Sequence, residues 1–164
     1  MDYSRIKEAV DIKLLKNTHI IGVGAGGAYC LYEALVRSGL GKLTVLDIDT
    51  VDDVNLCRQG FYPDQVGMMK VDALKEHLLR INPELDYTGI TDNFLYKREL
   101  ELKKIFGSAD LLLFLTDSFE AQALGEIIST SMQIPAIWGG YYEKSECSEI
   151  IFQIPEITQA TFKE

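Results

Sequence analysis

The chain has 164 residues, a length that predicts a single domain with a proper hydrophobic core. Hydrophobic residues make up 47% of it and charged residues 25%, as in an ordinary soluble globular protein, and the net charge of −9 argues against a nucleic-acid-binding surface. The sequence contains no apolar run of about eighteen residues and begins with a charged, amphipathic segment, so neither a membrane-spanning helix nor a signal peptide is predicted.

The first segment, residues 2–16, predicts an N-terminal amphipathic helix. Ile6, Val10 and Leu14 follow one another at spacings of four residues, with polar residues between them. This spacing places the three apolar side chains on one face of a helix.

From residue 18 onward, short apolar runs alternate with helical patterns. This alternation predicts an α/β fold of the Rossmann-like, doubly wound kind, with a mostly parallel sheet and helices on both faces. The last strand is expected to be antiparallel or at an edge. The predicted strands are residues 18–23, 42–48, 85–90, 109–115, 134–138 and 149–153, and the predicted helices are residues 28–38, 70–81, 96–106 and 119–132, with a loop containing short helical turns over 52–66.

A glycine-rich turn follows the first predicted strand. Gly22, Gly24 and Gly27 satisfy the pattern G-x-G-x-x-G, and Asp47 stands twenty residues beyond Gly27. In such a turn, backbone N–H groups approach a phosphate at a helix N-terminus, and the distant carboxylate binds ribose hydroxyls. The turn therefore predicts nucleotide binding, with a merely structural tight turn as the alternative. The pattern does not distinguish NAD from ATP.

Two cations lie beyond this turn, Arg58 and Lys70, and the amides of Asn55 and Gln59 lie close to Arg58 in the sequence. A guanidinium bridges two phosphate oxygens, and an ammonium acts as a point charge. Their position predicts a triphosphate site. From spacing alone, a pair of solvated surface cations is an equally good interpretation.

Three aspartates fall at the predicted carboxyl ends of strands, where α/β proteins bind ligands: Asp47, Asp49 and Asp117. Asp117 follows the most apolar strand. It is predicted either to cap the next helix or to hold Mg²⁺ against nucleotide phosphates, and one side chain can do both.

The segment around Gly139 and Gly140 also carries aromatic residues, namely Trp138, Tyr141 and Tyr142. We expect a flexible stretch that follows a strand and lines a substrate entrance. A core or dimer contact is the alternative.

Three widely spaced cysteines, Cys30, Cys57 and Cys147, include no C-x-x-C pair. They predict neither a disulfide framework nor a zinc site, and they favour a reducing, cytoplasmic location. Buried or incidental thiols are the preferred interpretation, with Cys57 and Cys147 as minor candidates for a nucleophile.

Taken in order, the strings GAGG, LDIDTVDDVNLCRQ, VGMMK, INPE and LTD resemble the ThiF/MoeB/HesA-like, ubiquitin-activating adenylyltransferase superfamily, over about residues 3–155. Members bind Mg-ATP on a Rossmann-like sheet, adenylate the C-terminal glycine of a small ubiquitin-like or sulfur-carrier protein, and release pyrophosphate. The resemblance implies Gly24, Gly26 and Gly27 in the nucleotide loop, Asp47 at the ribose with Asp49 nearby, Asn55, Arg58, Gln59 and Lys70 at the phosphates, and Asp117 at magnesium, with Arg58, Lys70 and Asp117 as the catalytic set.

Near the N-terminus, Tyr3-Ser4-Arg5 resembles the family's Tyr-x-Arg segment, whose arginine commonly reaches into a partner's site. This implies a homodimer in which Arg5 contributes in trans. The implied domain is a single ATP-binding adenylation domain over residues 1–164, with a nucleotide-binding core over 18–155.

The sequence departs from the family in three ways. Ser118 and Gln122 stand where the family often has Asn and Arg, and residues 157–162 stand where a Cys-x-x-Cys zinc half-site is common, so no zinc is expected. The chain also ends well short of the usual family length. It is expected to be either part of a longer protein or a short member, and no catalytic cysteine is assigned.

Three functions are weighed. The first is ATP-dependent adenylation of a ubiquitin-like protein, a sulfur carrier or a peptide C-terminus, and it is the interpretation adopted. The second is a non-catalytic, ATP-binding scaffold, which Ser118 and Gln122 favour. The third is an NAD-dependent oxidoreductase, which leaves Arg58 and Lys70 without a role.

Overall fold

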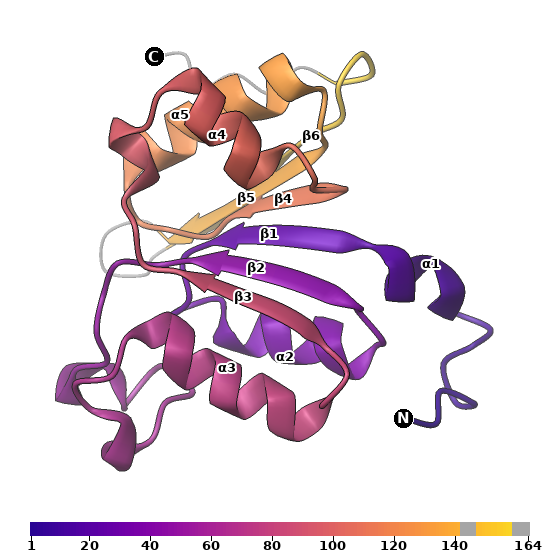
Figure 1. The fold of residues 1–164 in the computed structure, drawn as a ribbon, viewed down its shortest axis with the longest axis vertical. Helices are drawn as coiled ribbons and strands as arrows, with labels where there is room; N and C mark the ends of the chain where they lie inside the picture. The colour runs from indigo at the N-terminus through magenta and orange to yellow at the C-terminus, as the bar shows by residue number, and fades with distance from the viewer. Residues whose placement is uncertain (142–146, 159–164) are drawn as a thin grey trace.

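The structure, a computed structural model, describes residues 1–141 and 147–158. Its centre is one six-stranded sheet in the order β3-β2-β1-β4-β5-β6 (Figure 1). The first five strands are parallel, and β6 is antiparallel to β5 at the edge. The strands are β1 (His19–Val23), β2 (Lys42–Leu46), β3 (Asp86–Ile90), β4 (Leu111–Phe114), β5 (Ala136–Tyr141) and β6 (Ser148–Gln153).

Helices cover both faces of the sheet, which confirms the Rossmann-like prediction. In Figure 1, α2 and α3 lie against one face and α4 and α5 against the other. Each face has its own cluster of buried apolar side chains, as expected for parallel strands covered on both sides. The helices are α1 (Ile12–Asn17), α2 (Tyr29–Arg37), α3 (Lys70–Ile81), α4 (Glu99–Phe106) and α5 (Phe119–Met132), with short 3₁₀ helices η1 (Asp53–Asn55), η2 (Pro63–Gln65) and η3 (Phe94–Tyr96). None of the helices within the described residues has the length and apolarity needed to cross a membrane.

The N-terminal helix is shorter than the predicted 2–16. Regular helix covers only Ile12–Asn17, where the Asp11 carboxylate accepts a hydrogen bond from the Leu14 N–H at 3.0 Å and begins the helix. The preceding residues form isolated turns. Ile6 and Val10 are half-buried and Leu14 is exposed, so the three side chains do not form one buried face. Packing therefore does not extend the helix over the whole predicted range.

The expectation of a flexible segment at Gly139 and Gly140 is wrong. Both glycines lie within β5, where Gly139 pairs with Ile150 and Gly140 with Glu149 of β6. Trp138 is buried and stacks on Phe114 at 5.7 Å, so the core alternative holds for this side chain. Tyr141 is exposed at the end of β5, and Tyr142 lies outside the described residues.

A buried polar cluster joins three strands at their amino ends. The His19 Nδ1–H donates to the Ser108 carbonyl at 2.9 Å, and its Nε2 accepts from the Thr44 hydroxyl at 2.9 Å, an arrangement that fits a neutral imidazole. The Asp110 carboxylate accepts from the His19 backbone N–H at 2.7 Å. The imidazole thus links β1, β2 and the turn before β4.

This cluster makes stability depend on pH. Burial lowers the pKa of His19 below its ordinary value of 6.5, with Lys42 adding to the effect and the Ser108 carbonyl, Asp110 and Asp86 opposing it. The unfolded chain therefore binds a proton at a higher pH than the folded one. We expect this contribution to the free energy of unfolding to be complete above pH 6.5 and to decline as the pH falls below it.

Urea unfolding of the wild type and His19→Gln on either side of this pH tests the expectation. The wild type should lose more stability than the variant on acidification. Equal losses in both proteins would show that His19 does not cause the dependence.

Candidate functional site

The candidate site lies at the carboxyl ends of the parallel strands, where β1 stands between β2 and β4. The chain turns to one side of β1 to build β2 and β3 and to the other side to build β4 and β5. The carboxyl ends of β1 and β4 are therefore the topological switch point, where open α/β sheets bind ligands. The turn after β1 contains Gly24, whose N–H donates to the Leu46 carbonyl at 2.8 Å. A Cβ on Gly24 would lie 2.3 Å from the Leu115 carbonyl oxygen, and its φ of +96° also favours glycine. The two turns therefore touch.

Asp47 is the first residue after β2, and its carboxylate reaches the glycine turn. Its Oδ2 accepts from the Ala25 N–H at 2.7 Å and its Oδ1 from the Asp49 N–H at 2.9 Å. The side chain is half-buried. Asp47 thus shapes the turn predicted to bind phosphate, and its role at a ribose stays a prediction.

Lys70 lies at the start of α3, and its ammonium is held by Asp49, which follows the carboxyl end of β2. The two side chains form an ion pair at 2.8 Å, and the Lys70 N–H donates to the Asp49 carbonyl at 2.9 Å. An antiparallel bridge between Thr50 and Met69 holds the two segments together. Lys70 is only 7% exposed, which argues against a merely solvated cation.

The segment from Asp52 to Gln59 folds over the glycine turn. The Asn55 carboxamide oxygen accepts from the Asp52 N–H at 2.9 Å, closing a reciprocal cap of η1, so this oxygen has a structural role. Gln59 lies against Gly26, where a Cβ would be 2.7 Å from the Gln59 amide. The Gln59 Oε1 is buried without a hydrogen-bond partner. A ligand hydroxyl or amine would satisfy this oxygen, which fits a nucleotide.

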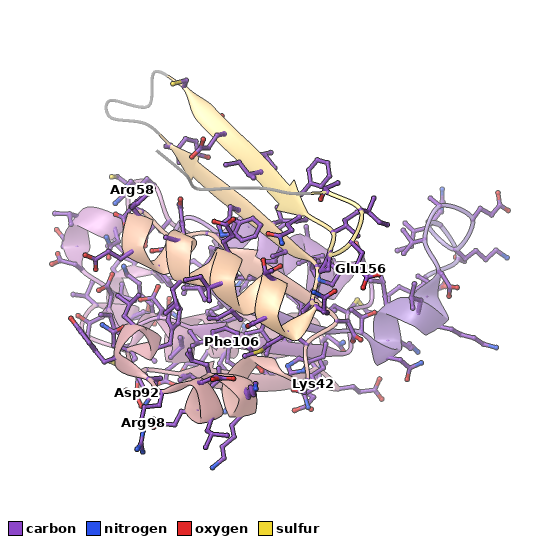
Figure 2. All side chains as sticks on the ribbon, turned by 90° about the horizontal axis from the view of Figure 1, so that it is seen from above. Lys42, Arg58, Asp92, Arg98, Phe106 and Glu156 are labelled. Carbon is purple, nitrogen blue, oxygen red and sulfur yellow. The ribbon has the colours of Figure 1, made fainter. Side chains whose placement is uncertain are left out.

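Arg58 is exposed, and its guanidinium forms no ion pair with residues 1–141 or 147–158. Figure 2 places it at the opposite end of the molecule from Lys42, the first residue of β2, and so at the edge that carries the other predicted residues. Gly27 is exposed too, and nothing lies within 4 Å of an added Cβ. Both residues remain accessible to a ligand.

Asp117 lies in the turn after β4, which contacts the glycine turn through Leu115. Ser118, rather than Asp117, caps α5, because its Oγ accepts from the Ala121 N–H at 3.2 Å. The Asp117 side chain is exposed and has no hydrogen bond to the described part of the chain. The helix-cap prediction for Asp117 is therefore wrong, and its carboxylate is available to a cation.

The structure does not bring Arg5 to this cluster. Arg5 is exposed in the N-terminal turns, and Tyr3 packs near Gly39, just before the start of β2. Figure 1 shows the N-terminus beyond the amino ends of the strands. Within one chain, the N-terminal turns that contain Arg5 lie at the amino ends of the strands, and the other predicted residues lie at the carboxyl ends.

Cys30, Cys57 and Cys147 are all exposed, which contradicts the first part of the expectation of buried or incidental thiols, and their interpretation as incidental thiols stays a prediction. No group of three or more His, Cys, Asp or Glu side chains within the described residues is arranged to hold a metal ion. A separate cavity of about 380 Å³, between η2 and α3, contains none of the predicted site residues.

Sequence reasoning missed Tyr32, a buried polar residue that contacts the site, and named Gln122 without assigning a contact to it. The Tyr32 hydroxyl donates to the Gly24 carbonyl at 2.8 Å, and the Gln122 amide donates to the Thr116 carbonyl at 2.7 Å. The available signal was a polar group on the buried face of a predicted helix.

Several known proteins are similar to this chain in sequence. A model of the ThiF family matches residues 3–159. The chain is 34% identical over 129 residues to ubiquitin-like modifier-activating enzyme 5 of Caenorhabditis elegans, covering 74% of this chain and 29% of that protein. It is 39% identical over 106 residues to molybdopterin-synthase adenylyltransferase of Escherichia coli, covering 63% and 41%.

Solved structures of known proteins are also similar to this chain in fold. The crystal structure of Escherichia coli MccB with AMPCPP and selenomethionyl MccA matches with a TM-score of 0.79 and 26% identity, over 89% of this chain and 43% of that one. The chain thus spans less than half the length of each of these three proteins.

Proposed function

The chain belongs to the ThiF family, and from that premise we propose that it is an ATP-dependent adenylating domain. The observation that carries the proposal is a glycine turn, a nearly buried lysine and an exposed carboxylate without a hydrogen bond to the described residues, all in segments that follow the carboxyl ends of the parallel strands. A glycine turn alone suits NAD or ATP. The cations add the charge that a triphosphate requires.

In this proposal, the carboxylate of a substrate attacks the α-phosphorus of ATP. A bond forms between the carboxylate oxygen and phosphorus, and the bond from phosphorus to the bridging oxygen of the β-phosphate breaks, so that pyrophosphate leaves. Such a step needs positioning and charge neutralisation more than proton transfer. Lys70 and Arg58 neutralise phosphate charge, and the glycine turn holds the nucleotide close to them.

Magnesium has one suitable protein ligand here. Mg²⁺ in nucleotide sites commonly binds one or two carboxylates together with phosphate oxygens and water. The exposed Asp117 carboxylate fits that requirement, while both oxygens of Asp47 accept backbone hydrogen bonds and Asp49 pairs with Lys70. We assign Asp117 as the magnesium ligand, with the metal contributing charge stabilisation of the phosphates.

The substrate class follows from the relatives' names. They include a ubiquitin-like modifier-activating enzyme, a molybdopterin-synthase adenylyltransferase and an MccB structure that contains MccA. We propose the C-terminal carboxylate of a ubiquitin-like protein, a sulfur carrier or a peptide as the substrate.

Exchange of labelled pyrophosphate into ATP tests this function, because exchange requires reversible formation of an acyl-adenylate. We expect exchange that depends on both magnesium and a carrier or peptide with a free C-terminal carboxylate. Normal Mg-ATP binding with no exchange for any carrier would instead support the non-catalytic scaffold. That alternative is favoured by Ser118 and Gln122, which stand where the family often has Asn and Arg.

We further propose a homodimer in which Arg5 completes the partner's site. The support is the position of the N-terminal turns that contain Arg5, which lie beyond the amino ends of the strands, whereas the other predicted residues follow their carboxyl ends. Mixing inactive Arg5→Ala and Lys70→Ala proteins in equal amounts, with subunit exchange, should restore about a quarter of wild-type exchange activity, since half of the dimers are then mixed and each has one intact site. No recovery in dimers shown to be mixed would contradict the contribution in trans.

A further inference from the structure

We infer that Tyr32 and Gln122 are positioning residues of this site: each is a buried donor, on the helix that follows a site-bearing turn, that fixes a backbone carbonyl of that turn. The inference rests on the proposed function and deepens it. It identifies what sets the distance between the glycine turn and Asp117.

Tyr32 holds the turn after β1. Its side chain is 0% exposed, and its hydroxyl donates to the Gly24 carbonyl at 2.8 Å. The hydroxyl reaches this carbonyl through space that a side chain on Gly22 would fill, because a Cβ there would lie 2.1 Å from the Tyr32 oxygen. Burial raises the pKa of Tyr32, which keeps the hydroxyl protonated and able to donate. Gly22 and Tyr32 therefore form one unit that fixes the orientation of Gly24.

Gln122 holds the turn after β4. It is 8% exposed, and its Nε2 donates to the Thr116 carbonyl at 2.7 Å, one residue before Asp117. The Ser118 N–H closes the same turn on the Thr116 Oγ1 at 3.2 Å. The backbone carbonyl of Gln122 accepts from the Trp138 indole at 3.0 Å, which ties this part of α5 to β5. The backbone on both sides of Asp117 is thereby fixed.

The two fixed turns are in contact. The carbonyl of Leu115, directly before Thr116, lies where a Cβ on Gly24 would be. A shift of the backbone in either turn should therefore displace the other, because the two backbones are packed too closely to admit even a Cβ on Gly24. Because a site for phosphate and magnesium requires its groups to be held in place before the ligand arrives, these two hydrogen bonds have a function beyond stability.

The two residues should affect different steps. Tyr32 acts on the turn whose N–H groups would bind phosphate, so its loss should weaken nucleotide affinity. Gln122 acts on the turn that carries Asp117, so its loss should lower the exchange rate with little effect on affinity. A purely structural role would instead change both in proportion to stability.

The variant Tyr32→Phe removes the hydroxyl group, and Gln122→Met removes the side-chain amide; both variants keep a similar shape. Ser129→Ala is the matched control: Ser129 is 0% exposed and its hydroxyl donates to the Ile134 carbonyl at 2.7 Å, at the other end of α5. The first measurement is hydrogen–deuterium exchange of the full chain without nucleotide. We expect faster exchange within residues 22–28 for Tyr32→Phe and within 115–121 for Gln122→Met, and in neither segment for Ser129→Ala.

The second measurement combines the Kd for Mg-ATP with the rate of pyrophosphate exchange. Loss of a buried hydrogen bond corresponds to about a fivefold change. We expect Tyr32→Phe to raise the Kd by about this factor, and Gln122→Met to lower the exchange rate by at least as much with the Kd within about twofold.

Unchanged amide exchange in both segments, or effects on Kd and rate that match those of Ser129→Ala at equal stability, would overturn the inference. Faster local amide exchange in the two variants, together with a wild type that binds no Mg-ATP, would support the two hydrogen bonds and contradict the proposed function. The failure of one is therefore distinguishable from the failure of the other.

Discussion

Asp117→Asn is expected to lower the rate of pyrophosphate exchange by roughly a hundredfold or more, with the fold intact. The carboxylate is exposed, has no hydrogen bond to the described residues and lies in the turn that contacts the glycine turn through Leu115, so its loss removes negative charge without disturbing packing. Without this charge, magnesium is held less well against the phosphates when pyrophosphate leaves.

Glu120→Gln is the matched control, because Glu120 is an exposed carboxylate in the first turn of α5, close in sequence to Asp117. This variant should retain its exchange rate. Arg58→Ala should lose exchange as Asp117→Asn does, since Arg58 is an exposed cation without an ion pair in the described part of the chain. Unchanged exchange in both Asp117→Asn and Arg58→Ala would contradict the proposed catalytic set.

Lys70→Ala is expected to weaken Mg-ATP binding by tenfold or more, about 1.4 kcal/mol. The ammonium is nearly buried at the start of α3 and is held by Asp49, two residues after Asp47, so phosphates bound at the glycine turn would meet a pre-oriented charge. Because the partner carboxylate is largely exposed, loss of the ion pair alone should cost little stability.

The control is Lys75→Ala, an exposed lysine on the same helix. Calorimetric titration should give wild-type affinity for this variant, and thermal unfolding should show that both variants are folded. A Lys70→Ala protein that binds Mg-ATP as tightly as the wild type would exclude Lys70 from the phosphate site.

Local patterns were sufficient to predict some elements. The predicted range of α3, residues 70–81, matches the structure, because Val71, Leu74 and Leu78 form a buried stripe and Asn82-Pro83 ends the helix. The N-terminal segment also has apolar residues at helical spacing. Their side chains do not form one buried face, and only six residues are helical. Periodicity shows which side chains share a face, and packing decides whether the helix forms.

Contacts between distant segments were beyond sequence reasoning. The adjacent glycines Gly139 and Gly140 predict a flexible stretch when only local sequence is considered. Backbone pairing with β6 instead keeps them in a strand. Similarly, the sequence places Asp47, Lys70 and Gln59 near a nucleotide only through motifs. Their hydrogen bonds to Ala25 and Asp49 and the packing of Gln59 on Gly26 depend on strand order and loop path.

The central claim, that the turns at the carboxyl ends of β1 and β4 form a site for ATP, is tested most directly by calorimetric titration of the purified chain with Mg-ATP and, separately, with NAD. We expect saturable binding of Mg-ATP, weakened at least about tenfold by Lys70→Ala, and weaker binding of NAD. Preference for NAD that is indifferent to Lys70, or binding of neither nucleotide, would contradict the claim.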